Sequence, residues 1–271
     1  DRDPRLYQSY AYPGWELIHT ETYSQGAGIY VQKLQKNSTG YHQIKGFVNT
    51  QDRNIYESVD FPVMRYAEVL LIYAEARAEL AELTQSDLDI TVNVLRDRAG
   101  MPHLTMNPPV DPVQNKRFPN LSSGTSNWKE LLEIRRERRI EMAFEGRRWD
   151  DLMRWHAGKL LEKEPEGLYF PSLGKYDLNG DDVEDIILID GSESIPEAED
   201  KEKNTLGVTL KYYRVGLQDS DVDVYLSNGT SGVIEGSKER GTFVEPKYYY
   251  RPIPQKHVTL NPNLKQVFGW E

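Results

Sequence analysis

Oxygen-bearing side chains recur at every second residue along one short acidic segment. Asp177, Asn179 and Asp181 carry carboxylate or amide oxygens, and Asp185 follows four residues later. Calcium takes about six to eight oxygen ligands in flexible geometry, and a tight loop that turns alternate side chains inward supplies them. The backbone carbonyl of Val183 would complete the set, as in other calcium loops. The spacing therefore predicts calcium as a structural cofactor, held by Asp177, Asn179, Asp181, Val183 and Asp185.

The same segment departs from a complete EF-hand loop at two positions. Position six is Asp182 instead of Gly, and position twelve is Leu188 instead of Glu. Glu184 is a further donor that can replace one of the five predicted ligands. Because Asp, Asn and Gly favour turns for reasons of their own, a plain acidic turn is the alternative interpretation.

Aromatic residues gather near the start of the chain, in a stretch without a helical period. Sugar rings present C–H faces that stack on aromatic side chains, and loops carry binding residues more often than core elements do. The candidate ligand-binding residues are therefore Trp15, Tyr12, Tyr10 and Tyr30, with Trp15 beside Gly14 as the first choice. The alternative is that these rings only fill the core or the surface. Other aromatic residues are expected to pack in strands (Tyr212, Tyr213 and Tyr248 to Tyr250) or in the helical core (Trp128, Trp149 and Trp155).

Composition restricts the classes of function that remain. The chain has 271 residues, a net charge of −10 and no cysteine. Disulfides, thiolate metal sites and cysteine nucleophiles are therefore excluded, and nonspecific nucleic-acid binding is disfavoured. No G-x-S-x-G, H-E-x-x-H, Walker or G-x-G-x-x-G motif occurs, and the five histidines lack ligand spacing. We therefore predict that the chain is not an enzyme.

Two helices are predicted ahead of a proline-rich loop. Apolar residues spaced by three, four and seven predict a helix over 63–83 whose buried face holds Val63, Tyr66, Val69, Leu70, Tyr73 and Leu80. Its alanines would let a second helix approach closely. Ser86 is expected to cap the next helix, which Gly100 and Pro102 end. Residues 101–126 are expected to form a long loop.

A third helical region and an irregular region follow. Asn127 to Glu130 fit a capping box ahead of a helix that Gly146 breaks, and 147–156 continue as a helix. The charged block from Arg135 to Asp151 is interpreted as a solvated or inter-helix ion network. Residues 165–249 are expected to be loops with short strands, for example at 186–189 and 222–226.

Several strings resemble one known family. Arg65 to Leu71 (RYAEVLL) and Tyr73 to Ala76 (YAEA) resemble a signature of the SusD/RagB family of outer-membrane nutrient-binding lipoproteins. Similar matches follow in the family order at Thr39 to Tyr41 and Lys45, at Asn93, Arg96 and Arg98 to Gly100, at Arg135 to Trp155, and at Tyr250 to Pro254, Asn261 to Leu264, Gln266, Gly269 and Trp270. They span nearly the whole chain.

The resemblance implies a mainly α fold with tetratricopeptide-like helix pairs and an irregular, loop-rich subdomain carrying short strands. On this basis 1–60 are loops and short strands, 61–160 the helical scaffold, and 161–271 the irregular part and closing segment. The chain would be the C-terminal portion of a precursor whose signal peptide and lipidated cysteine lie outside these residues.

The implied function is non-catalytic binding of a glycan or other nutrient and its delivery to a TonB-dependent, SusC-like transporter. The implied place is the cell outer membrane, surface-exposed and lipid-anchored through a cysteine absent from this chain. Two alternatives come from other classes of protein. One is a helical-repeat protein–protein interaction module, and the other is a surface glycoside hydrolase, since abundant carboxylates do not exclude a catalytic pair.

Overall fold

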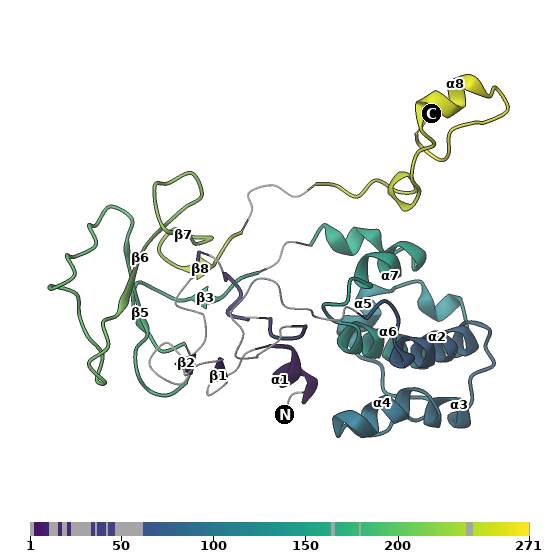
Figure 1. Ribbon diagram of the computed structural model, residues 1–271, viewed down its shortest axis with the longest axis horizontal. Coiled ribbons are helices and arrows are strands. Elements are labelled where there is room, and N and C mark those ends of the chain that lie inside the picture. The colour runs from purple at the N-terminus through teal and green to yellow at the C-terminus, as the bar shows by residue number, and fades with distance from the viewer. Residues whose placement is uncertain are drawn as a thin grey trace. The chain divides into compact units, whose positions relative to one another are not determined.

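The computed structural model describes residues 3–10, 16–17, 21–22, 34–35, 37–41, 43–46, 62–163, 166–178, 180–236 and 241–270. Its elements are labelled in Figure 1. The chain divides into two compact units. We call them the helical unit (Asp1–Arg5, Phe61–Lys163 and Arg240–Glu271) and the strand unit (Leu6–Asp60 and Glu164–Glu239).

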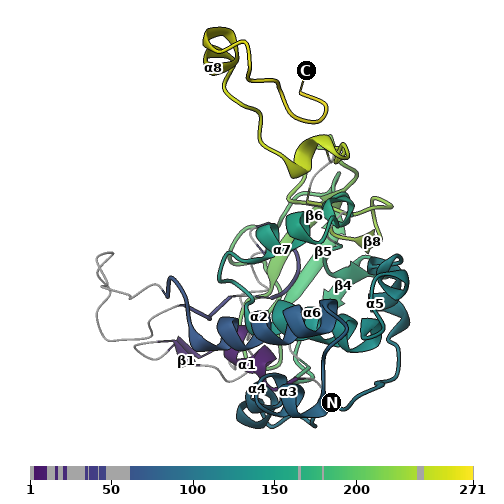
Figure 2. The same ribbon diagram turned by 90° about the vertical axis from the view of Figure 1, so that its right-hand side faces the viewer.

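The helical unit is built around two long helices that lie side by side (Figure 2). These are α2 (Tyr66–Glu79) and α6 (Trp128–Glu141). Leu71, Ala74 and Ala78 of α2 are fully buried in the same core as Leu131 and Ile134 of α6. The remaining helical elements are α3 (Gln85–Asp89), α4 (Val92–Ala99), α5 (Pro112–Arg117), η2 (Leu121–Ser123), α7 (Arg148–Arg154), η3 (Gly158–Leu161), η4 (Lys247–Tyr249) and α8 (Gln255–Leu260).

The first predicted helix exists, but it is shorter than 63–83 and buries a different face. Its buried apolar residues are Ala67, Leu70, Leu71, Ala74 and Ala78. Of the predicted face only Leu70 is buried, and Val63, Tyr66, Val69, Tyr73 and Leu80 are exposed, Tyr66 by 72%. Ala67, Ala74 and Ala78, at spacings of seven and four residues, let α6 approach closely, as predicted. They form the packed face together with Leu70 and Leu71.

The second predicted helix is two helices, and its cap lies two residues earlier than expected. Thr84, not Ser86, caps α3: its Oγ1 accepts from the backbone N–H of Asp87 at 3.2 Å, and Asp87 Oδ2 accepts from the backbone N–H of Thr84 at 2.8 Å. This reciprocal pair satisfies two otherwise unpaired donors. Gly100 ends α4 in the left-handed region at φ 66°, as predicted.

The predicted capping box at Asn127 is wrong. Asn127 makes no side-chain cap bond to its own helix and instead accepts from the backbone N–H of Leu83 at 3.4 Å. Glu130 accepts from the backbone N–H of Asn107 at 2.6 Å. The oxygens of both side chains are therefore occupied by backbone N–H groups of connecting segments and not by the N–H groups of their own helix. These bonds fix the connecting segments to α6.

The predicted loop 101–126 contains α5 and η2. Asp111 caps α5 by accepting from the backbone N–H of Val113 at 2.7 Å, and Pro112 occupies the first helical position, where a missing N–H costs nothing. The third helical region matches the expectation more closely, because α7 spans most of 147–156. However, α6 already ends at Glu141, before Gly146.

The strand unit is centred on a four-stranded sheet of order β4-β5-β6-β7. Its strands are β4 (Gly174–Tyr176), β5 (Ile186–Asp190), β6 (Lys211–Gly216) and β7 (Val224–Tyr225). β4 is antiparallel to β5, whereas β5, β6 and β7 run parallel. Antiparallel pairs join β3 (Tyr169–Phe170) to β8 (Gly232–Val233) and β1 (Glu16–Leu17) to β2 (Glu21–Thr22), and the short helix α1 spans Arg5–Ser9.

The sheet has a core of its own. Ile186 and Leu188 of β5 pack with Tyr213 and Val215 of β6, and Tyr213 Oη accepts from the backbone N–H of Leu34 at 3.2 Å. Tyr212 and Tyr213 therefore pack in a strand as predicted. Tyr248 and Tyr249 do not, because they lie in η4, and Tyr250 does not either, because it follows η4 outside any strand. Within the described ranges, no helix has both the length and the apolar character required to cross a bilayer.

Candidate functional site

Buried ion pairs hold the helices of the helical unit together. Arg138 on α6 places Nε 2.8 Å from both carboxylate oxygens of Asp151 on α7. Arg154 bonds Asp151 at 2.9 Å and also reaches Glu75 on α2 through two bonds of 2.6 Å. Trp155 Nε1 donates to the same Glu75 carboxylate. Three helices are thereby joined through two buried carboxylates.

A second group of ion pairs surrounds Glu137 and Glu141 of α6. Glu137 accepts from Arg5 at 2.5 Å and from Arg96 of α4 at 2.9 Å. Glu141 accepts from Arg65 and Arg98, each at 2.7 Å. Burial alone would raise the pKa of Glu141, but the hydrogen bonds and charges of the arginines outweigh it, so its pKa lies below the usual 4.5. The charged block is therefore an inter-helix ion network as predicted, and a buried one.

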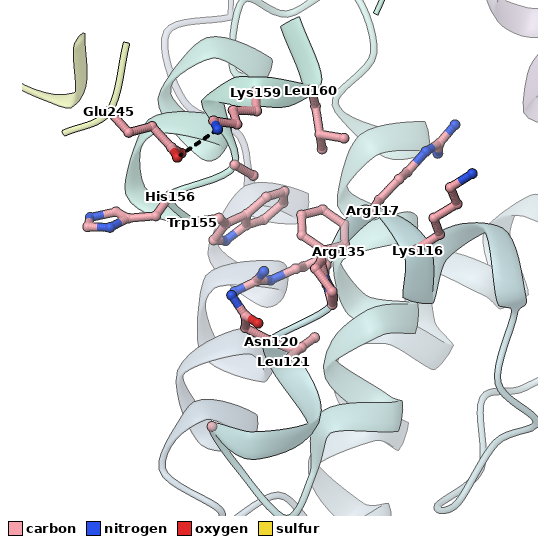
Figure 3. A pocket seen from close by; sticks show the side chains of 14 residues that line it. Lys116, Arg117, Asn120, Leu121, Arg135, Trp155, His156, Lys159, Leu160 and Glu245 are labelled. Atoms are coloured by element: carbon pink, nitrogen blue, oxygen red, sulfur yellow. Dashed lines mark ion pairs between the residues drawn. The ribbon is translucent and has the colours of Figure 1, made fainter. Parts of the chain in front are cut away.

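A pocket of about 510 Å³ opens beside this network (Figure 3). It lies entirely within the helical unit, and chain segments far apart in sequence contribute to it. The lining residues are Lys116, Arg117, Phe118, Pro119, Asn120, Leu121, Gly124, Arg135, Trp155, His156, Ala157, Lys159, Leu160 and Glu245. No sequence pattern described above predicts this site, although Trp155 lies in the core as predicted.

Aromatic rings and guanidinium groups alternate at the base of the pocket. Phe118 and Trp155 meet edge to face, with ring centroids 5.7 Å apart. The guanidinium carbon of Arg135 lies 5.0 Å from the Phe118 centroid and 4.6 Å from that of Trp155. Arg154 and Arg148 approach the Trp155 ring at 4.8 and 5.8 Å. Trp155 is 9% exposed, so these cations occupy the ring faces that a ligand would need for stacking.

The pocket is electropositive. Four lining side chains are cationic (Lys116, Arg117, Arg135 and Lys159), against one carboxylate, Glu245. Burial lowers the pKa of Arg135, and its Nε–H is buried without a hydrogen-bond acceptor. Next to the pocket, burial and then the positive charges of Arg139 and Arg117 lower the pKa of Arg148 to about 10. This region therefore favours a negative charge.

The pocket's rim is held by polar contacts to the C-terminal segment. Tyr249 Oη accepts from the backbone N–H of Gly158 at 3.0 Å and donates to Glu245. The Tyr249 ring stacks on His156 with centroids 4.6 Å apart. Lys159 Nζ lies 3.7 Å from Glu245. Burial and the bond to Glu245 raise the pKa of Tyr249 to about 12, so the phenol stays protonated.

Of the four predicted ligand-binding residues, the structure describes only Tyr10. Trp15, Tyr12 and Tyr30 lie outside the described residues. Tyr10 is half-buried in the strand unit, forms a bridge to Gln43 and has its ring centroid 5.1 Å from that of Tyr41. Their role in ligand binding stays a prediction. Trp149, predicted to be core, is 51% exposed, so that expectation is wrong.

The acidic segment forms the connection between β4 and β5. Asp177 Oδ1 and Oδ2 accept from the backbone N–H groups of Gly180 and Asp182, both at 2.8 Å. Asp181 Oδ1 accepts from the backbone N–H of Val183 at 2.9 Å. Gly180 and Asp182 have φ of 80° and 63°, which gives a tight left-handed turn. Asn179 lies outside the described residues.

Among the predicted ligands that the structure describes, only Asp185 is deeply buried. It is 3% exposed, its Oδ2 accepts from the backbone N–H of Leu178 at 2.8 Å, and its Oδ1 has no hydrogen-bond partner. Burial, and then the charges of Asp181 and Asp177, raise its pKa to about 6. A cation would relieve both effects. In the residues that the structure describes, however, no three His, Cys, Asp or Glu side chains gather as a metal site.

The protein combines a helical scaffold, which buried ion pairs hold together, with a loop-rich strand unit. These two features define the class of protein to which it belongs. Several of the motif residues that carry the resemblance, among them Arg65, Glu75, Arg96 and Asp151, take part in the buried ion network. Residues 1–270 match the model of the SusD family, and the chain belongs to that family.

Individual relatives agree with this assignment. The chain is 36% identical over 118 residues to the SusD-like protein P2 of Formosa agariphila, a match that covers 44% of this chain and 21% of that protein. A SusD-like carbohydrate-binding protein from Bacteroides fragilis is 27% identical with a TM-score of 0.52, covering 98% of this chain and 42% of the other. A second SusD-like protein from B. fragilis is 21% identical with a TM-score of 0.53, over 99% of this chain and 39% of the other.

These comparisons confirm the predicted SusD-like fold class. They also give the extent of the match: the chain spans about two fifths of the length of these two solved relatives, and less of the curated one.

Proposed function

We propose that this chain belongs to a non-catalytic protein that binds a glycan nutrient at the bacterial outer surface and delivers it to a TonB-dependent, SusC-like transporter. The observation that carries the proposal is the SusD-family match over 1–270, in a family that includes a relative described as carbohydrate-binding. Attachment to the outer membrane through a lipidated cysteine outside these residues is part of the same proposal.

The geometry of the helical unit supports binding. The pocket is lined by side chains from helices that buried ion pairs fix in place, so its donors need little ordering when a ligand arrives. Its volume lies within the range of roughly 300–1,000 Å³ that is typical of small-ligand sites. Aromatic residues near the N-terminus, Trp15 first, are proposed as a second contact surface for an extended glycan.

Calcium is proposed as a structural cofactor of the strand unit. The support is the unpartnered, buried Oδ1 of Asp185 close to the charges of Asp181 and Asp177. Asp177, Asn179, Asp181 and the Val183 carbonyl would supply the further oxygens, and the ion would hold the connection between β4 and β5 as a fixed turn.

Affinity electrophoresis of the chain through gels that contain one polysaccharide each tests the proposed function. Neutral and acidic polysaccharides are compared with a polymer-free gel, and released reducing ends are measured in parallel. Retardation without new reducing ends is the expected result. Release of reducing ends would instead indicate a glycoside hydrolase, and migration unchanged in every gel would refute glycan capture by this chain.

A further inference from the structure

We propose that the pocket in the helical unit binds the anionic group of an acidic sugar, a uronate carboxylate or a sulfate ester. The inference rests on the proposed function, because it names the class of glycan that this site would take. It concerns the pocket lined by Arg117, Arg135 and Trp155, and not the aromatic residues near the N-terminus.

The charge of the pocket lining is opposite in sign to the net charge of the chain. The whole chain carries a net charge of −10, yet the pocket lining has four cations and one carboxylate. That carboxylate, Glu245, already receives the Tyr249 hydroxyl and lies 3.7 Å from Lys159 Nζ. In Figure 3, Lys116 and Arg117 lie on the opposite side of the cavity from His156. An anion that enters between them meets an excess of positive charge.

Guanidinium groups lie over the aromatic rings of the pocket. Neutral sugars are commonly held by stacking on an open ring face, but cations cover the Trp155 ring, and Arg135 also lies over Phe118. The rings therefore fix the guanidinium of Arg135 in orientation and do not offer a platform to a sugar. What remains at this site is a set of N–H donors and positive charges.

Arg135 has a hydrogen-bond donor without an acceptor. Arg135 lines the pocket and is 7% exposed, with one long bond of 3.3 Å from Nη2 to Glu79 and an Nε–H that has no acceptor. A guanidinium presents its N–H groups in a planar fork that matches the oxygens of a carboxylate or sulfate. The Asn120 side chain adds a neutral amide to the same lining. These donors suit an acidic sugar whose hydroxyl groups lie next to its anionic group.

A charge-matched pair of double variants tests the inference. Lys116→Gln/Arg117→Gln removes two charges from the pocket, and Lys256→Gln/Lys265→Gln removes two from exposed positions near the C-terminus outside the pocket lining. Calorimetric titration uses three oligosaccharides: oligogalacturonate, its carboxyl-reduced neutral counterpart, and a sulfated galactan oligosaccharide. Melting temperature and circular dichroism confirm that both variants fold.

The expected result is that the pocket variant weakens binding of an acidic oligosaccharide by about tenfold, and the control variant by less than about twofold. Affinity should also fall as salt is raised from low to physiological concentration. The oligosaccharide that responds identifies the anion: oligogalacturonate for a carboxylate, the sulfated galactan for a sulfate ester.

Two other outcomes overturn the inference in different ways. If the neutral oligosaccharide binds as tightly as the acidic ones and the pocket variant has no effect, the chain captures glycan but the pocket does not select an anion. If none of the three oligosaccharides binds, and no polysaccharide retards the chain in the gels, the proposed function falls together with the inference.

Discussion

Arg65 and Glu141 form an ion pair between the start of α2 and the end of α6, with Nη1 2.7 Å from Oε1. Glu141 is 3% exposed, and it also accepts a hydrogen bond from Arg98 of α4. Each partner thus comes from a different one of the motifs by which the family is recognised. The motifs are best explained as complementary halves of one buried network, since a buried charge without its partner is costly.

Replacing Glu141 by Gln should strongly destabilise the helical unit. The substitution keeps the size of the side chain but removes the negative charge that Arg5, Arg65 and Arg98 share. Removing one partner of a buried ion pair lowers the free energy of unfolding by about 3–5 kcal/mol. We expect a loss of about 3 kcal/mol, because the amide oxygen still accepts hydrogen bonds. Urea unfolding followed by circular dichroism measures the change.

Glu82→Gln is the matched control for this substitution. Glu82 is an exposed residue just after α2 that pairs with the partly exposed Arg77 at 2.6 Å. An exposed pair contributes little, so its loss should stay within about 1 kcal/mol. Equal destabilisation by the two substitutions would contradict the central role given to Glu141.

Acid should destabilise the chain through the same carboxylate. The pKa of Glu141 in the folded state lies below the value of 4.5 for a free side chain, because the arginines outweigh the opposite effect of burial. A carboxyl group with a lowered pKa adds stability above its unfolded pKa, and this contribution is lost as the pH falls from 4.5 through the folded value. The melting temperature, measured from pH 7 to pH 3, should therefore drop below about pH 4.5.

Glu141→Gln removes this titration and provides the control for the pH effect. The difference in melting temperature between the native chain and the variant should shrink as the pH falls through this window. If the difference in melting temperature stays constant down to pH 3, the pKa of Glu141 is not lowered by its ion pairs and this prediction is wrong.

The sequence predicted where helices and strands lie better than which faces they bury. Three correct predictions each have a local cause in the sequence. Gly100 provides a left-handed cap, 186–189 is a run rich in β-branched residues, and the residues around Leu152 have a helical period. The buried face of α2 was missed because it carries Glu68 and Glu75, whose arginine partners lie on other helices. A rule that places apolar residues inside cannot find such a face.

The pocket was missed for a related reason. Arg117, Arg135, Trp155 and Glu245 come from four separate segments, and no local pattern joins them. The available signal was weak: Arg148 and Trp155 are seven residues apart, a spacing that places these two residues on one helix face. Tryptophan and arginine on a helix most often pack against neighbouring side chains, as Trp155 does. The positive charge of the arginines indicates a binding site only once the neighbouring segments of the fold are known.

The predicted role of Trp15 can be tested by truncation. Trp15→Ala should weaken binding of whichever polysaccharide retards the chain by about tenfold or more, because stacking on an indole ring would be lost. Trp149→Ala is the matched control, since Trp149 is an exposed tryptophan that does not line the pocket. Unchanged retardation of the Trp15 variant would remove this residue from the proposed binding surface.

Calcium should stabilise the strand unit if the acidic segment holds it. Adding millimolar calcium to chelator-treated protein should raise the melting temperature and slow proteolysis between β4 and β5, because an ion would fix the turn and neutralise the buried Asp185. Asp185→Asn should abolish both effects, whereas Asp200→Asn, at an exposed aspartate of the same unit, should leave them intact. Insensitivity of the native chain to calcium would refute the calcium site.

Gly158 should control how the C-terminal segment attaches to the pocket's rim. A Cβ at this position would overlap the ring of Phe243, and the backbone N–H of Gly158 donates to Tyr249. Gly158→Ala should therefore displace both aromatic residues and expose residues 241–270 to protease, with an overpacking cost of about 1–3 kcal/mol. Gly124→Ala is the control, because a Cβ there would lie at an ordinary 3.5 Å from the Leu121 carbonyl oxygen. Limited proteolysis followed by mass spectrometry distinguishes the two variants, and equal resistance at 241–270 would show that Phe243 can move aside without releasing the segment.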